Sequence, residues 1–293
     1  LYGATLTGAD LTRANLKEAK LGGANLKEAK LYDANLQGAN LKEANLKEAN
    51  LTGANLKGAI LYEVNLSYAD LREANLEGAN LIDADLGVAN LNKAILLNAI
   101  LINTKLSEAE LNNTNFSGAT ITNSDLSGIE SNNANFIGAN FSGTDLSGAE
   151  LFNANLTDAN LTKSKLYMAY LQDVELLRVN FTGADLSGAN LIRANFSGAN
   201  LEKAELSFAN IDGVIFCNTK TPWGIDNSGC IGNVSADEVE TNALKLKALL
   251  ACEKCNLSGT KLQEADLFGA DLQGANLEGA NLMGADLRNA NLK

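Results

Sequence analysis

The chain has 293 residues, a formal net charge of -12 and no histidine. Its acidity argues against nonspecific binding to nucleic acids or anionic membranes, and the lack of histidine excludes the usual Ser-His-Asp and Cys-His catalytic pairings. No apolar run reaches the roughly 18–20 residues that cross a bilayer, so we expect no membrane insertion by this segment.

A five-residue repeat, A-(N/D)-L-x-x, runs through residues 1–216. A large apolar residue stands at every fifth position from Leu1 to Phe216, and of these 44 positions only Ser131 is not Leu, Ile or Phe. A small residue, nearly always Ala, precedes it by two positions, and mostly Asn or Asp lies between them. A period of five fits neither an α-helix nor a simple strand. Each unit is therefore predicted to be a short extended piece followed by a corner.

Four such units return the chain above its starting point, so coils of twenty residues can stack through backbone hydrogen bonds about 4.8 Å apart. The Leu and Ala side chains are predicted to point inward, and the two x positions outward. At Ile129 and Ser131 the large and small inward residues have changed places. A tight core tolerates such a volume-conserving exchange, although a local slip in register is the alternative.

This repeat resembles that of the pentapeptide-repeat family over most of the chain. The resemblance implies an all-β fold, a right-handed quadrilateral parallel β-helix. Residues 1–216 would then form about 11 coils and residues 257–293 about 2 more, which continue the same β-helix. The expected total is about 13 coils, with one inserted loop plus a short α-helix over residues 217–256.

The first half of this insert is a loop with the sequence CNTKTPWGIDNSGC, bounded by Cys217 and Cys230. Its Pro and Gly residues are typical of turns. We expect the loop to lie on the flank of the rod, and Trp223 to pack within its own loop, with an exposed contact residue as the alternative.

The second half predicts a helix over about 236–251. Ser235 is a plausible N-cap, and Glu238 completes a capping box with it. An apolar stripe follows at helical spacing and would lie against the flank of the rod. It consists of Val239, Ala243, Leu246 and Leu250.

The chain holds four cysteines, and all are disulfide candidates: Cys217, Cys230, Cys252 and Cys255. Structural disulfides, Cys217–Cys230 first, are favoured over free buried thiols and over metal or redox chemistry. A zinc site would need all four because no histidine is present. The insert resembles cysteine-bounded inserts in pentapeptide-repeat proteins of cyanobacteria and the thylakoid lumen. That resemblance favours the thylakoid lumen or the periplasm over the cytoplasm.

An apolar patch is predicted on the outside of the rod. Residues 93–105 carry apolar side chains at outward positions where the repeat has polar ones. Because residues twenty apart should stack, five apolar residues are expected to share one face, with two more around the adjacent corner. We call this set the isoleucine patch: Ile60, Tyr62, Ile82, Ile100 and Ile102 on the face, and Ile95 and Leu97 around the corner. Contiguous exposed apolar surface indicates a contact, whereas isolated apolar residues would need no explanation.

No residue pattern indicates a catalytic, cofactor-binding or metal-binding site. We therefore predict a non-catalytic structural or protein-interaction scaffold without a cofactor, whose partner is another protein or a second copy of the chain. Direct nucleic-acid binding is not expected. A redox-responsive protein acting through its cysteines is a weaker hypothesis.

The family resemblance also implies an alternative function, because its best-known members mimic DNA and inhibit gyrase, a type II topoisomerase. B-DNA carries one negative charge per roughly 1.7 Å along its length. In this chain, however, residues 1–60 hold eight Lys and Arg against six acidic residues, and residues 61–216 hold eight against nineteen. The mimicry would be partial at best.

Overall fold

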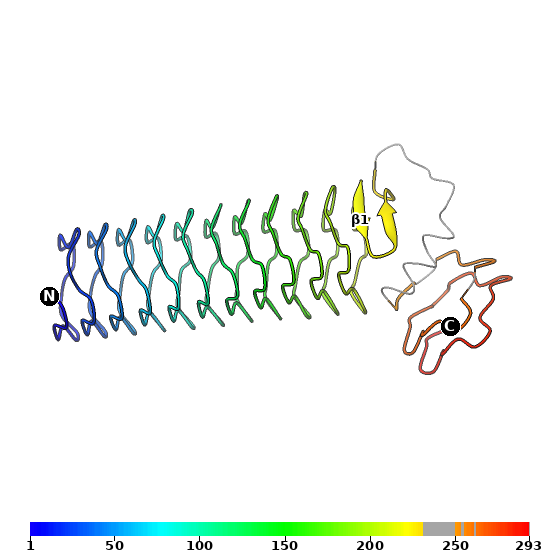
Figure 1. The fold of residues 1–293 in the computed structure, drawn as a ribbon, viewed down its shortest axis with the longest axis horizontal. Coiled ribbons are helices and arrows are strands. Elements are labelled where there is room, and N and C mark those ends of the chain that lie inside the picture. Colours follow the sequence, from blue (N-terminus) through cyan, green and yellow to red (C-terminus); the bar gives the residue numbers. More distant parts are fainter. Residues whose placement is uncertain (231–249, 253–254, 261, 293) are drawn as a thin grey trace.

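The computed structural model describes residues 1–230, 250–252, 255–260 and 262–292, which form a long rod of stacked coils and a smaller C-terminal block (Figure 1). Along the rod, parallel bridges join each outward residue of a coil to the residue twenty positions later. They begin at Thr5↔Asn25 and extend to Asn200↔Lys220. The chain thus winds as a β-helix with twenty residues in each coil, which confirms the predicted period.

Each corner is a four-residue turn closed by a backbone hydrogen bond, such as that from Ala29 N–H to the Leu26 carbonyl at 3.0 Å. The second corner residue has a φ near +60° even where it is not glycine, as at Glu28 (φ 59) and Val88 (φ 58). A type II turn requires this conformation, which is uncommon for other residues. The N–H of Glu28 donates to the Lys47 carbonyl of the next coil at 2.9 Å, so stacking holds the turn in place.

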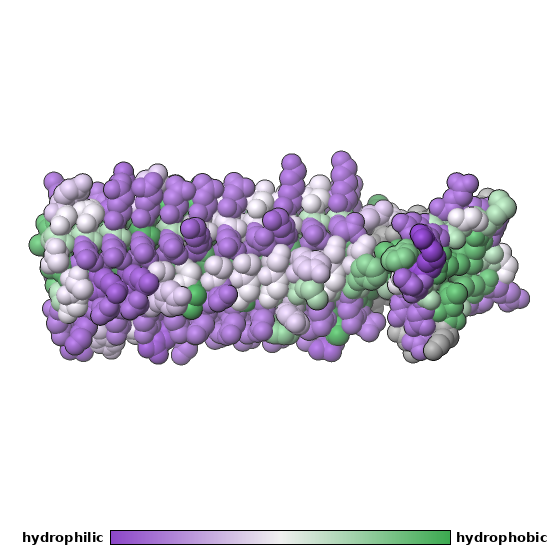
Figure 2. Space-filling model, turned by 90° about the horizontal axis from the view of Figure 1, so that it is seen from below, coloured by the Kyte–Doolittle hydropathy of each residue, from purple (hydrophilic) through white to green (hydrophobic). Residues whose placement is uncertain are grey.

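The Asn or Asp before each Leu has a hydrogen-bonding role. Its Oδ1 accepts a hydrogen bond from the backbone N–H two residues later: Asn25 from Lys27 at 3.2 Å, and Asn80 from Ile82 at 3.1 Å. The side chain thereby closes an Asx turn at the start of the corner, with a net contribution of roughly 1 kcal/mol. These residues and the polar corners make the face shown in Figure 2 predominantly hydrophilic along the rod.

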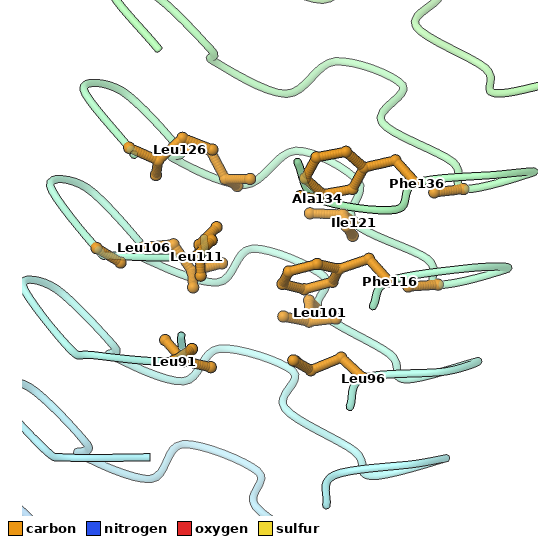
Figure 3. Close-up of a cluster of buried hydrophobic side chains, with 14 of the residues drawn as sticks. Leu91, Leu96, Leu101, Leu106, Leu111, Phe116, Ile121, Leu126, Ala134 and Phe136 are labelled. Atoms are coloured by element: carbon orange, nitrogen blue, oxygen red, sulfur yellow. The ribbon is translucent and has the colours of Figure 1, made fainter. Parts of the chain in front are cut away.

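The Leu and Ala side chains fill a dry interior, as predicted. From Leu21 to Leu201 the inward leucines are at most 1% exposed. Figure 3 shows how they stack coil upon coil, with phenylalanine replacing leucine in places. Phe136 stacks on Phe116 with ring centroids 5.3 Å apart and meets the ring of Phe141 edge-on at 5.2 Å.

The exchange at Ile129 and Ser131 leaves the register intact. Both side chains are fully buried, and the Ser131 hydroxyl donates to the Glu150 carbonyl at 3.1 Å. Glu130, between them, bridges Glu110 and Glu150 as its position in the coil requires. The structure therefore supports the volume-conserving exchange over a slip.

A hairpin closes part of the rod's end. Strand β1 (Thr219–Thr221) pairs antiparallel with β2 (Gly224–Asp226), and Lys220 in β1 also bridges Asn200 of the preceding coil. Figure 1 shows the hairpin at the end of the stack. The antiparallel strand interrupts the parallel stacking on this side of the coil.

Trp223 anchors the hairpin to the core. Its side chain is 6% exposed, its ring meets Phe216 edge-on at 5.8 Å, and its Nε1 donates to Asp226 Oδ2 at 3.0 Å. Trp223 is thus packed inside its own loop, as expected. The expectation that the loop lies on the rod's flank is wrong, because it packs on the last phenylalanine of the core and covers the end.

The predicted helix over about 236–251 falls mostly outside the described residues. Its last two positions are not helical, since Leu250 has a φ of 51° and Ala251 bridges Asp271 in parallel. Repeat structure thus resumes at Ala251, one unit before Leu257, and Cys252 takes an inward position. Leu257, Leu262 and Leu267 belong to a second buried cluster, separate from that of the rod.

Candidate interaction surface

All seven residues of the isoleucine patch lie on the outside of the rod. Ile60, Ile95 and Ile100 are 42%, 41% and 37% exposed, and the other four are partly exposed. Bridges from Ile60 to Asn80 and from Asn80 to Ile100 place these residues in one column. Ile95 lies in the neighbouring column, between Asn75 and Asn115.

The corner residues of the patch stack beside this column. The N–H of Glu63 donates to the Ile82 carbonyl, and that of Asp83 to the Ile102 carbonyl, at 3.0 and 2.9 Å. Tyr62, Ile82 and Ile102 are therefore one coil apart along the same corner. The structure brings the predicted residues together as the twenty-residue period requires.

Isoleucine at 60, 95 and 100 removes a hydrogen bond that the fold uses elsewhere. The N–H groups of the following corners, at Tyr62, Leu97 and Ile102, face a side chain that cannot accept. Asn80, in the same column, keeps its bond to the N–H of Ile82. These isoleucines therefore expose apolar surface and give up local stabilisation.

Charged residues border the patch at Tyr62. Lys42 Nζ lies 5.2 Å from the centre of the Tyr62 ring. The hydrogen bond between the Tyr62 hydroxyl and Glu63, together with the negative charge of Glu63, raises the pKa of Tyr62. Asp83 accepts a hydrogen bond from Asn103 at 3.1 Å one coil later. An acidic edge thus runs beside the apolar face.

A second exposed group, which the sequence analysis missed, lies two sides around the coil. We call it the aromatic cluster, and it consists of Phe152, Tyr167, Met168 and Tyr170. Tyr167, Met168 and Tyr170 are 52%, 56% and 45% exposed, and the Phe152 and Tyr170 rings are 5.9 Å apart. The signal in the sequence is YMAY at 167–170, where aromatic residues fill outward positions. Phe152 joins them only through the coil stacking.

The four cysteines form two disulfides, Cys217–Cys230 and Cys252–Cys255, with Cα atoms 4.8 and 5.5 Å apart. This agrees with the favoured prediction and argues against free thiols. Within the described residues no group of three His, Cys, Asp or Glu side chains could hold a metal ion. The same part of the chain contains no helix long and apolar enough to span a bilayer.

Comparisons with known proteins agree with this architecture. The family model for pentapeptide repeats matches in 8 copies. They cover residues 1–33, 29–67, 59–97, 69–107, 89–128, 132–166, 180–216 and 252–289. Among curated protein sequences none matches.

Three solved structures illustrate the similarity. HetL, a pentapeptide repeat protein involved in heterocyst differentiation regulation in the cyanobacterium Nostoc, is 34% identical over 68% of this chain and 90% of its own, with a TM-score of 0.31. A pentapeptide repeat protein of the Arabidopsis thaliana thylakoid lumen is 30% identical over 41% of this chain and 70% of its own, with a TM-score of 0.27.

Full-length QnrB1, a plasmid-mediated fluoroquinolone resistance protein, is 16% identical over 97% of this chain and 91% of its own, with a TM-score of 0.25. The family model alone covers well over half of the residues, in both the rod and the C-terminal block. The chain therefore belongs to the pentapeptide-repeat family.

Proposed function

We propose that this protein is a non-catalytic scaffold that binds another protein, or a second copy of itself, through the isoleucine patch. The scaffold is a right-handed quadrilateral β-helix of about 11 coils, and the C-terminal repeats add about 2 coils with a buried cluster of their own beyond the insert. A rod of this kind offers long flat faces and a filled interior, which suit binding better than catalysis.

One observation carries the proposal: Ile60, Ile95 and Ile100 replace Asn at positions where Asn stabilises the corner. Neither folding nor solubility benefits from these replacements, because each exposes apolar surface and removes a side-chain acceptor. Ile60 and Ile100 are two coils apart in one column. Ile82, beside Asn80 on the coil between them, joins them into one surface. A partner that buries this surface would explain why the chain retains it.

Replacing Ile82 and Ile102 with lysine should abolish the contact, because two charges would be buried without partners. For self-association, the mass of the whole protein in solution should fall to that of one chain across a concentration series. If the partner is a different protein, the variant should no longer capture a protein that the wild-type chain retains.

Thr162→Lys and Thr182→Lys, in the same corner column and three or more coils beyond Ile102, provide the matched control and should keep wild-type behaviour. If the Ile82 and Ile102 variant matches wild type in both mass and capture, the patch is not the contact.

A DNA-mimic inhibitor of gyrase is the second candidate, favoured by the excess of acidic residues over 61–216. The balance of charge over residues 1–60 and the lysine–glutamate pairs on this part of the surface, such as Lys27–Glu28 at 3.1 Å, weaken the mimicry. A supercoiling assay with the whole protein separates the candidates: a scaffold should leave gyrase activity unchanged.

We further propose an oxidising compartment, either the thylakoid lumen or the periplasm. Both cysteine pairs are bonded, and such bonds persist mainly outside the reducing cytosol. The similarity to a thylakoid-lumen protein points the same way. Thiol counting on protein isolated under acid quench tests this, since the oxidised state predicts no free thiol.

A further inference from the structure

We propose that a second docking surface, on the side of the rod opposite the column of Ile60 and Ile100, binds a basic polypeptide segment that carries an aromatic or large apolar residue. Two features of one face support this: the aromatic cluster and a column of glutamates that leads into it. The proposal goes beyond the isoleucine patch and does not depend on it.

One member of the aromatic cluster, like Ile60, Ile95 and Ile100, replaces a residue that serves the fold. Tyr170 occupies the outward position of the repeat, where Asn would accept from the corner N–H, and it bridges Glu150 and Asn190. Met168 extends over Gly188 of the next coil, which has no side chain to block it. No side chain of the next coil therefore opposes Met168.

Three glutamates continue the column of Tyr170 toward the N-terminus: Glu110, Glu130 and Glu150, which we call the glutamate ladder. Parallel bridges join Glu110 to Glu130, Glu130 to Glu150 and Glu150 to Tyr170. Their Cα atoms therefore repeat about every 4.8 Å along the rod. Glu108 adds a fourth negative charge, because its side chain lies over Gly128 beside Glu130.

Within the part of the chain that the structure describes, no lysine or arginine forms an ion pair with Glu110, Glu130 or Glu150, although the charge of Glu110 contributes to a raised pKa at Arg72. The corners beside it carry small or uncharged residues, with Ser127 and Ser147 on one side and Asn112 and Asn132 on the other. Glu110 accepts hydrogen bonds only from amide groups, those of Asn90 at 2.6 Å and Asn92 at 2.7 Å.

Other acidic residues nearby are already paired. Asp173, at the corner beside the aromatic cluster, forms a two-point ion pair with Arg193. The hydrogen bonds from the Arg193 guanidinium lower the pKa of Asp173. The ladder thus differs from Asp173, because no guanidinium in the described part of the chain forms an ion pair with its carboxylates.

Charge complementarity therefore selects the occupant. From Glu110 to Tyr170 the column spans roughly 14 Å, the length of about four to five residues in an extended chain. Lys or Arg side chains of such a segment can meet successive carboxylates, and its aromatic residue can pack on Phe152 and Tyr170. An arginine at the junction can also stack on the Tyr170 ring.

The test uses the whole protein and a fluorescein-labelled heptapeptide that contains three basic residues and has a tryptophan at one end. A second peptide with the reverse sequence is tested beside it. We expect at least one peptide to bind saturably, and binding to weaken as salt rises. Tyr170→Asn should weaken binding about tenfold, as loss of an aromatic anchor does. Glu130→Asn should weaken it about two- to fivefold.

Both substitutions introduce the residue that the repeat prefers, so the fold should be retained, and circular dichroism checks this. Asp85→Asn removes one charge from a neighbouring face and is the matched control; its affinity should stay within twofold of wild type. The proposal is overturned if neither peptide binds saturably, or if Tyr170→Asn binds as wild type does. It is also overturned if Asp85→Asn weakens binding as much as Glu130→Asn, which would indicate an effect of net charge alone.

Discussion

Replacing Phe136 with alanine should destabilise the rod by about 3–5 kcal/mol, the usual penalty for removing a buried aromatic ring. Phe136 is fully buried and contacts Phe116 in the coil before it and Phe141 in its own coil. Because each coil contacts only its neighbours, unfolding should begin around this cavity and spread outward. Denaturant unfolding followed by circular dichroism measures the loss.

Ile137 provides the control, since it is the next residue and is 39% exposed at a corner. Ile137→Ala should change the free energy of unfolding by less than about 0.5 kcal/mol. Equal effects of the two substitutions would mean that the interior is not the close-packed ladder described above.

Replacing Trp223 with alanine should open the end of the rod. The substitution removes the ring that packs on Phe216 and the hydrogen bond to Asp226, a loss of about 3–5 kcal/mol for a buried tryptophan. The Cys217–Cys230 disulfide keeps the loop attached, so the damage should be local. Backbone amides of the last coil, such as those of Ala204 and Ala209, should exchange hydrogen faster.

The matched control lies in the same hairpin. Ile225 in β2 is 70% exposed, so Ile225→Ala should leave amide exchange in the last coil at the wild-type rate. If Trp223→Ala also leaves it unchanged, the hairpin does not protect the end of the core.

The winding of the rod could be predicted because Leu and Ala recur every five residues. A coil of four such units, twenty residues in all, turns all of these side chains toward the interior. The same twenty-residue period predicted that Ile60, Ile100 and Ile102 share one face. Both inferences need only the spacing of apolar residues. They hold wherever the repeat is unbroken, including the exchange at Ile129 and Ser131.

Features that depend on backbone conformation could not be predicted in this way. The role of Asn as an acceptor for the corner N–H, and the positive φ at corners such as Val88, follow from the turn type. The five-residue period does not specify that turn. Glycine is common at the second corner position, but this is only a weak indication of a positive φ there, because glutamate and asparagine often replace it.

The position of the Cys217–Cys230 loop was misjudged for another reason. A break in a repeat shows where the chain departs from the coil, but not which surface the departing segment covers. That choice depends on contacts such as Trp223 against Phe216. The aromatic cluster was missed because Phe152 and Tyr170 are 18 residues apart and adjoin only after winding.

The most direct test of the account is to restore the residue of the repeat at the isoleucine patch, with Ile95→Asn and Ile100→Asn combined in one variant. We expect the free energy of unfolding to stay unchanged or to rise by up to about 2 kcal/mol, because two corner N–H groups regain an acceptor, while association through the patch is lost. A variant that is less stable than wild type and still associates normally would show that these isoleucines serve the fold and not a partner.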